Sequence, residues 1–298
     1  MIDRIALHTH SHHSDGKDTV EELVYAMDAA RVKAAVLSDH DNVGGVEEFQ
    51  TRTIAIGIES MTCFELSTCY EKNHYIHILA YGFDLEKYEL VREGLEKNCQ
   101  AHNECFGETI SDVNESLGLD LTTEFVREKT KRAGKTNFTF PLFKHLIENL
   151  GFPPELVAKI IFGKSSPMRR LLSSGKLMTL EEGMVFIKKI GATPVLAHPG
   201  FFTEYSVNQK GAEKQLEKLF ETLIDLGLKG AEYYYPYPDK PEIQFFADIS
   251  KRIIEKHREL WKLSGSDYHG GYKTNACGIA MPGMSLEEFR KFKNFCER

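Results

Sequence analysis

Short apolar runs alternate with stretches of helical periodicity in the first third of the chain. The apolar runs predict strands at 5–7, 34–38, 53–58 and 75–81. Helices are expected between them at 19–33 and 46–52, and the first has the capping-box sequence Thr19-Val20-Glu21-Glu22. This order predicts a chain that begins with a βαβ unit.

The pattern changes at 86–175, where polar helical stretches are broken by glycine and proline and no strand is expected. Alternation then resumes, with strands expected at 193–197, 230–235 and 260–264. Helices are expected after Thr179, at 213–226, at 242–258 and after Ser285. We therefore expect an α/β domain with a largely parallel sheet or barrel, formed by 1–85 and 176–298, and a helical insertion at 86–175.

Polar side chains gather directly after several of the predicted strands. In α/β sheets and barrels, the loops beyond the carboxyl ends of the strands form the active site. The candidate residues are His8, His10, Asp15, Asp39, His40, Asp41, Glu65, His77, His198, Asp267 and His269. His8 and His10 are two apart on a strand and point to the same face, so they can bind one ion, and Asp267 and His269 repeat that spacing.

Each of these groups has an ordinary explanation when it is taken alone. The histidines after the first strand could be exposed polar residues, the 38–41 segment could cap a helix, and His77 could be a hydrogen-bonded core histidine. Glu65 among apolar neighbours is costly to bury unless it is paired or bound to a metal. It is less plausible that every one of these ordinary explanations holds in a single chain than that the residues share one site.

Composition narrows the functional classes. The net charge of −7 and pI near 6.0 argue against non-specific electrostatic binding to the phosphates of long nucleic acids. The six cysteines include no C-x-x-C pair, and no signal peptide or long apolar segment is evident. We expect a cytoplasmic protein with no membrane partner and no extended nucleic-acid binding.

The segments LHTHSHHSDG, SDHD, the lone Glu65, HIL, AHPG and GSDYHG, in this order, resemble the motif set of the PHP (polymerase and histidinol phosphatase) family of metal-dependent phosphoesterases. The resemblance implies a distorted (β/α)7 TIM-like barrel. It also implies a trinuclear centre at the strand ends, with three divalent transition-metal ions. Imidazole and carboxylate ligands suit Mn, Zn or Fe better than Mg.

Carried over by motif, the resemblance divides the ligands among three metal ions. The first ion would be bound by His8, His10, Glu65 and Asp267. Glu65 would bridge to a second ion that His77 and His198 complete. The third ion would be bound by Asp15, His40 and His269.

The implied activity is hydrolysis of a phosphomonoester by a metal-bridging hydroxide, with phosphate as product. The expected substrate is a small phosphorylated metabolite. Within that class we expect a nucleotide, either a 3′,5′-bisphosphate or a short oligonucleotide end. His198 and Asp267 are expected at the reacting centre. Asp39 and Asp41 are expected to orient His40 or move a proton, with a structural role for either as the alternative.

Phosphate recognition needs basic side chains. The candidates are Arg132, Lys135, Arg169, Arg170 and Lys273, each of which could equally be a solvated charge. The insertion is the expected specificity element, because it interrupts the domain after the strand that carries His77. Where the nucleotide-directed branch has an Arg-Pro-His-like start, this chain has the residues 137–141, NFTFP.

The remaining histidines are expected to be structural or solvent-facing. His12 and His13 lie in the first loop, and His74 is three residues from His77, on the opposite strand face. His102, His145 and His257 fall on helical stretches, where surface histidines are ordinary, although His145 could touch substrate.

Three rival functions stay open. Histidinol phosphate is an alternative substrate, and a non-catalytic metal-binding PHP module is an alternative role. An amidohydrolase shares H-x-H after the first strand but usually has a lysine on a middle strand, where this chain has Glu65. Because no ligand position is missing, we favour an enzyme.

Overall fold

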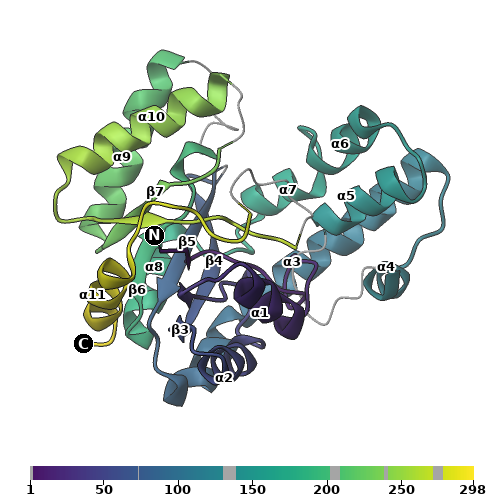
Figure 1. The fold of residues 1–298 in the computed structure, drawn as a ribbon. Helices are drawn as coiled ribbons and strands as arrows, with labels where there is room; N and C mark the ends of the chain where they lie inside the picture. The colour runs from purple at the N-terminus through teal and green to yellow at the C-terminus, as the bar shows by residue number, and fades with distance from the viewer. Residues whose placement is uncertain (1–2, 73, 130–138, 202–208, 238–240, 271–277) are drawn as a thin grey trace.

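The computed structural model has a mixed α/β fold (Figure 1), and it describes residues 3–72, 74–129, 139–201, 209–237, 241–270 and 278–298. Within these ranges, no helix combines the length and the apolar character needed to cross a membrane.

The first sheet is small and parallel. It contains β1 (Ile5–Ala6), β2 (Ala34–Ala35) and β3 (Glu59–Ser60), connected by α1 (Val20–Ala29) and α2 (Val46–Ala55). Thr19 caps α1 through the predicted capping box. The strand predicted at 53–58 is wrong, because α2 continues to Ala55 and the strand begins only at Glu59.

The second sheet has the order β4-β5-β6-β7-β8. Its strands are β4 (Cys63–Tyr70), β5 (His74–Tyr81), β6 (Thr193–Leu196), β7 (Gly230–Tyr234) and β8 (Trp261–Ser264). β5 runs antiparallel to both β4 and β6, whereas β6, β7 and β8 are parallel. The expectation of a largely parallel sheet is therefore wrong for the pairs that involve β5 and correct for β6 to β8. The sequence pattern also did not predict β4 as a strand.

Isolated bridges connect the two sheets near the strand ends, between Thr9 and Tyr268 and between His40 and Glu65. These contacts bring the carboxyl ends of β1 and β2 beside β8 and β4. Continuous strand pairing does not close the described sheets into a ring, so the expected (β/α)7 barrel is not established.

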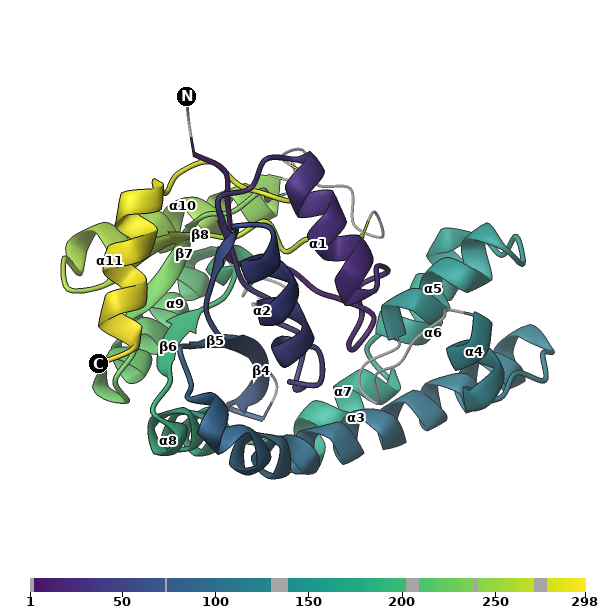
Figure 2. The same cartoon turned by 60° about the horizontal axis from the view of Figure 1, so that its bottom comes forward.

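The helices of the α/β part bury apolar faces against the sheets. Val20, Leu23 and Met27 of α1 pack with Ala6 and Ala35 of the first sheet. The second sheet is covered by α8 (Leu180–Ile190), α9 (Gln209–Asp225), α10 (Pro241–Lys256) and α11 (Leu286–Cys296). Figure 2 shows α11 beside β6, and α8 at the opposite end from α10.

The segment between β5 and α8 is helical, as predicted. After the short η1 (Leu85–Lys87) come α3 (Tyr88–Leu117), α4 (Thr123–Lys129), α5 (Thr139–Glu148), α6 (Pro154–Phe162) and α7 (Pro167–Ser174). These helices form a lobe beside the α/β part (Figures 1 and 2).

The long helix α3 belongs to both parts of the molecule. Val91 and Leu95, near its start, pack into the main α/β core. Phe106 and Val113, further along, pack with Leu142 and other apolar residues in the core of the helical lobe. The lobe is thus anchored to the α/β part by one continuous helix.

Candidate metal centre

Histidines and carboxylates converge in three overlapping groups, from segments that follow strands and, for Glu65 and His77, from within β4 and β5. Ligand atoms within each group lie within 4.8 Å of one another. The groups are His8, His10, Glu65 and Asp267; His10, Asp15, His40 and His269; and His40, Glu65 and His77. Residues 57 or more positions apart in the sequence, such as His8, Glu65 and Asp267, are therefore neighbours in space.

Glu65 lies at the centre of this arrangement. It is on β4, on the same strand face as Cys63, and its side chain is fully buried. Five imidazoles surround the carboxylate at 3.0 to 3.2 Å: His8, His10 and His40 at Oε2, and His77 and His198 at Oε1. A carboxylate with both oxygens directed at imidazole nitrogens is placed to bridge two cations.

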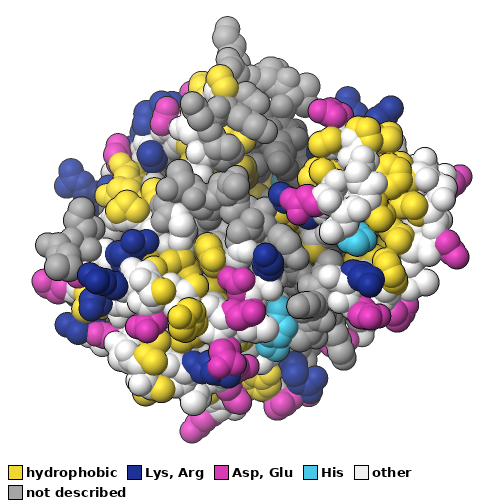
Figure 3. Space-filling model, turned by 45° about the vertical axis from the view of Figure 1, so that its right-hand side comes forward, with side chains coloured by type: hydrophobic (Ala, Val, Ile, Leu, Met, Phe, Trp, Pro, Cys, Tyr) yellow, Lys and Arg dark blue, Asp and Glu magenta, His cyan; other side chains and the backbone are white. Residues whose placement is uncertain are grey.

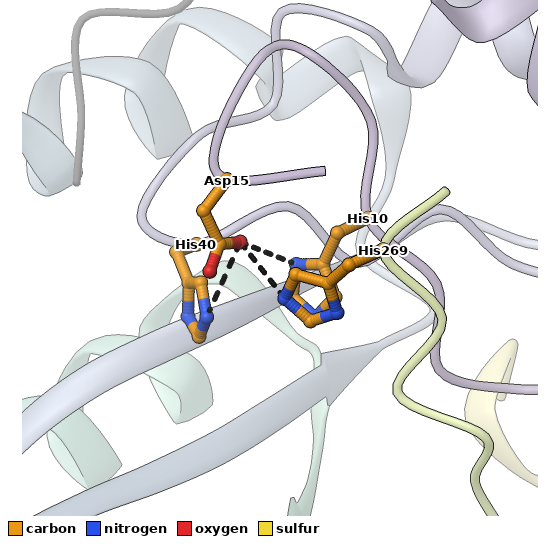
Figure 4. Close-up of side chains that lie close together, drawn as sticks. All are labelled: His10, Asp15, His40 and His269. Atoms are coloured by element: carbon orange, nitrogen blue, oxygen red, sulfur yellow. Dashed lines mark ion pairs between the residues drawn. The ribbon is translucent and has the colours of Figure 1, made fainter. Parts of the chain in front are cut away.

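Asp15 forms a second carboxylate centre, shown in Figure 4. Its Oδ1 lies 3.0 Å from Nε2 of His269, 3.6 Å from Nδ1 of His10 and 3.7 Å from Nε2 of His40. The other ring nitrogens of His10 and His40 lie 3.2 Å from Glu65. These two histidines therefore stand between the two carboxylates.

The donor set fits transition-metal ions. His10 Nε2 and Asp15 Oδ1 are buried and face other ligand groups of the cluster at 3.2 Å and 3.0 Å, yet neither makes a well-formed hydrogen bond within the described residues. Buried polar atoms are nearly always hydrogen-bonded, so such atoms directed at one place indicate a ligand. Neutral imidazoles and carboxylates are the ligands that Zn, Mn and Fe accept.

Electrostatics inside the cluster are strongly coupled. Burial raises the pKa of the Glu65 carboxyl, but His40, His8 and His77 outweigh it and hold the pKa well below its usual range. Burial lowers the pKa of His10, yet Asp267, Glu65 and Asp15 raise it to about 9. For His40, burial prevails and lowers the pKa to about 3. Glu65 thus stays charged, as a carboxylate ligand must.

The backbone is unusual at several of these positions. Asp41, His198 and Asp267 have positive φ angles of 47°, 28° and 48°. Non-glycine residues adopt this region rarely, and such strain concentrates at functional sites. The observation agrees with the expectation that the segments following β2, β6 and β8 carry the site.

Asp39 does not face the cluster, and its predicted catalytic role is not supported. Its Oδ1 accepts hydrogen bonds from the Ser11 backbone N–H at 2.8 Å and the Ser14 hydroxyl at 2.5 Å. Its Oδ2 accepts from the Ser11 hydroxyl at 2.6 Å. Both carboxylate oxygens therefore hold the loop that follows His10 and precedes Asp15.

Asp41 and His102 connect the site to the helical lobe. Asp41 Oδ1 accepts hydrogen bonds from the Ser67 backbone N–H and the Asn98 side chain, and its Oδ2 lies 3.3 Å from His102 Nε2. The prediction that His102 is an ordinary surface histidine is wrong, since it is only 2% exposed. These contacts fasten α3 to the loop after His40.

A cavity of about 310 Å³ opens beside the cluster. Its polar side consists of Asp15, His40, His77, His198 and Asp267. The rest of its wall is mainly apolar and includes Ile76, Phe140, Phe162, Met168, Phe201 and Leu219. The insertion contributes Thr139, Phe140, Phe162 and Met168 to this wall, and Figure 3 shows hydrophobic side chains gathered on the lobe at the right of the view.

The predicted phosphate-binding residues are not gathered by the described structure. Arg132, Lys135 and Lys273 lie outside the described residues. Arg169 follows Met168 on α7 but is not part of the cavity lining. Arg170 is exposed and bonds to Glu108, Asp112 and the Ser165 carbonyl, so the expectation that it binds substrate is not supported.

Three other histidines outside the cluster lie in surroundings that agree with their expected structural or surface roles. His74, on β5, is buried near Tyr70 of β4. His257 is partly exposed beside Glu259. His145 contacts Phe125 within the lobe and does not line the cavity.

Two residues of the site were missed. Glu232 on β7 is fully buried with its carboxylate 2.9 Å from His8 Nδ1, and Tyr235 donates a 2.6 Å hydrogen bond to Asp267 Oδ2. The signal for Glu232 was present, because an acidic residue in the apolar segment Gly230–Tyr234 resembles the pattern that singled out Glu65.

Residues 6–116 match the family model of the PHP domain. This part of the chain is similar to the PHP domain family. The match includes His8, His10, Asp15, His40, Glu65 and His77, and the remaining predicted ligands lie beyond it.

Relatives that align over most of the chain are named as enzymes that cleave phosphate esters. The chain is 25% identical over 278 residues to the 5′-3′ exoribonuclease Rnm of Escherichia coli, covering 88% of this chain and 84% of the relative. It is 25% identical over 273 residues to a 3′,5′-nucleoside bisphosphate phosphatase of Chromobacterium violaceum, covering 89% and 87%.

The fold is also found in solved structures. One, from Chromobacterium violaceum, is described as an amidohydrolase with bound sulfate and no metal. It superposes with a TM-score of 0.77 at 21% identity and covers 98% of this chain and 96% of its own. At this identity the likeness establishes the fold alone.

Proposed function

We propose that this PHP phosphoesterase hydrolyses a phosphomonoester of a nucleotide, either a 3′,5′-bisphosphate or the end of a short oligonucleotide. The observation that carries the proposal is the cavity, which has a histidine and carboxylate cluster on one side and, on the other, an apolar wall that includes several aromatic rings. The first side suits a phosphate with metal ions, and the second suits an organic ring.

The nine predicted ligands support a site for up to three divalent ions. Those ions, when bound, supply positive charge for phosphate oxygens and a water of lowered pKa. The chain's own part is to fix the geometry: Glu65 joins the histidine groups, and Asp15 gathers His10, His40 and His269. No protein nucleophile is required.

The apolar wall supports a nucleotide over a smaller phosphate ester. Aromatic side chains bind bases by stacking, which is tolerant of base identity. Phe140 and Phe162 come from the insertion and Phe201 follows β6, so both parts of the molecule contribute aromatic rings to the cavity. The relatives named for nucleotide and RNA substrates favour the same class.

A phosphate-release screen tests the proposal. The purified protein, loaded with Mn²⁺ or Zn²⁺, would be given nucleoside 3′,5′-bisphosphates, a short 5′-phosphorylated oligonucleotide, histidinol phosphate and small aryl phosphates. We expect the highest kcat/KM for one of the nucleotides. Preference for histidinol phosphate would favour that substrate instead, and turnover of nucleotide diesters alone would contradict the monoesterase assignment.

The non-catalytic alternative is tested with the same preparation. His198→Ala and Asp267→Ala should each abolish phosphate release while the thermal transition is retained. A protein that binds metal but releases no phosphate from any substrate in the screen would be a metal-binding module.

A further inference from the structure

β7 contributes none of the predicted metal ligands, yet it carries the buried acidic side chain Glu232. The side chain is fully buried, where an ionised carboxylate is costly unless its oxygens are bonded. Its Oε1 lies 2.9 Å from Nδ1 of His8. Its Oε2 accepts a 2.6 Å hydrogen bond from the backbone N–H of His198.

The two oxygens therefore contact ligands that belong to different parts of the cluster. His8 Nε2, the other ring nitrogen, lies 3.0 Å from Glu65 Oε2 and 3.4 Å from Asp267 Oδ1. His198 Nε2 lies 3.1 Å from the opposite oxygen of Glu65. One carboxylate thus contacts Nδ1 of His8, the ring nitrogen that faces away from Glu65, and also the backbone N–H of His198.

The surroundings of Glu232 are shaped to admit it. A Cβ at Gly265 would overlap the Glu232 carboxylate, so the glycine leaves the space that the side chain occupies. His198 has a φ of 28°, and the hydrogen bond that its backbone N–H donates to Glu232 Oε2 holds the amide of that strained residue. Three separate segments, on β7, after β6 and after β8, are therefore fitted around this carboxylate.

We propose that Glu232 is a positioning residue of the metal centre. Its Oε1 accepts a hydrogen bond from the Nδ1–H of His8, and this tautomer directs the Nε2 lone pair of His8 into the cluster. Its Oε2 fixes the backbone of His198, from which the second ring projects. Carboxylates behind metal-bound histidines set the tautomer and orientation of the ring in this way. The inference rests on the proposed metal centre but not on the identity of the substrate.

Glu232→Gln tests the proposal with little change in shape. Both donors that face Glu232 need an acceptor, whereas an amide offers one acceptor oxygen and one NH₂ donor. One of the two hydrogen bonds must therefore be lost. The matched control is Glu255→Gln on α10, where an exposed Glu accepts a hydrogen bond from Tyr233. Tyr233 is adjacent to Glu232 on β7, so its side chain lies on the opposite face of the strand.

The first measurement is Zn²⁺ affinity of the metal-free proteins by competition with a chelating dye. We expect Glu232→Gln to weaken at least one Zn²⁺ site about 10- to 100-fold, the usual effect of losing such a partner. Glu255→Gln should bind like wild type. Wild-type affinity in Glu232→Gln would overturn the role of Glu232, whereas failure of the wild-type protein to bind Zn²⁺ would overturn the metal centre itself.

The second measurement needs no variant, so it holds even if Glu232→Gln does not fold. Long-range ¹H–¹⁵N spectra of the zinc-loaded wild-type protein should give a slowly exchanging Nδ1–H for His8, with Nε2 carrying no proton. A His8 ring protonated at Nε2 in that protein would overturn the proposal. In a folded Glu232→Gln variant the Nδ1–H signal should shift or exchange faster.

Discussion

The two sides of the cavity are built in different ways. The ligand cluster comes from the strands of the α/β part and the segments that follow them. Most of its members are less than 5% exposed and joined by short contacts, as with Glu65 and Asp15. The insertion side comes from helices with their own core, and one of its cavity residues, Phe162, is 45% exposed. The ligand side is therefore rigid and buried, whereas the insertion side is more exposed, and we propose that the α/β part fixes the chemistry and the helical lobe selects the substrate.

The largest expected effect comes from the centre of the cluster. Glu65→Gln replaces a carboxylate that faces five imidazoles. Losing the hydrogen-bond partner of a metal ligand reduces activity up to roughly 100-fold, so losing Glu65 itself should reduce kcat by more than that. Metal content should fall with it, as measured by plasma mass spectrometry after dialysis. Full metal content together with unchanged turnover would break the assignment of chemistry to the α/β part.

The next effect is on stability of the lobe. Leu142 on α5 is fully buried in the core of the helical lobe, and Leu142→Ala should cost about 2–5 kcal/mol through loss of packing and a cavity. Denaturant unfolding followed by circular dichroism measures the loss. Because the cluster is built on other elements, Zn²⁺ affinity should be unchanged. A parallel loss of metal binding would mean that the two regions are not separable.

A smaller effect is expected at the cavity wall. Phe162→Ala removes an aromatic ring, and since stacking is worth about 1–3 kcal/mol per base, KM for the preferred nucleotide should rise about 5-fold or more. The value of kcat/KM for a small phosphomonoester should change little. Leu156→Ala, on the same helix, similarly exposed and outside the cavity lining, is the control. Equal losses for nucleotide and small ester would argue against selection by the lobe.

The smallest effect concerns the junction where the α/β pattern resumes after the lobe. Thr179 caps α8 through a capping box with Glu182, and Thr179→Ala should reduce the free energy of unfolding by about 1 kcal/mol. Activity and metal content should match wild type, because α8 contributes no residue to the cluster. Thermal unfolding and the phosphate-release assay together check this expectation.

Much of the ligand cluster could be predicted from the sequence. Spacing of two on a strand placed His8 and His10 on one face, and the rule that strand ends carry the site placed Asp267 beside them. The structure brings these three together with Glu65, in the grouping that the family resemblance implied. The second and third groups differ in detail, because His40 contacts both Glu65 and Asp15, and His10 does the same.

The misses have physical reasons. The apolar run at 53–58 belongs partly to α2, and Ile54 is 72% exposed there; short apolar runs do not distinguish helix from strand. β4 was missed because Ser67 and Thr68 interrupt its apolar pattern. The role of Asp39 depended on which way its carboxylate points, and the hydroxyls of Ser11 and Ser14 that decide this lie in a neighbouring loop that local sequence does not place.

The most direct test of the account is an anomalous-difference map from crystals grown with excess Mn²⁺. The account predicts peaks at coordinating distance from Glu65 and Asp15, with His8, His10 and Asp267 completing one of the sites. A well-ordered crystal with no peak beside Glu65, or with Mn²⁺ bound only elsewhere on the surface, would contradict it.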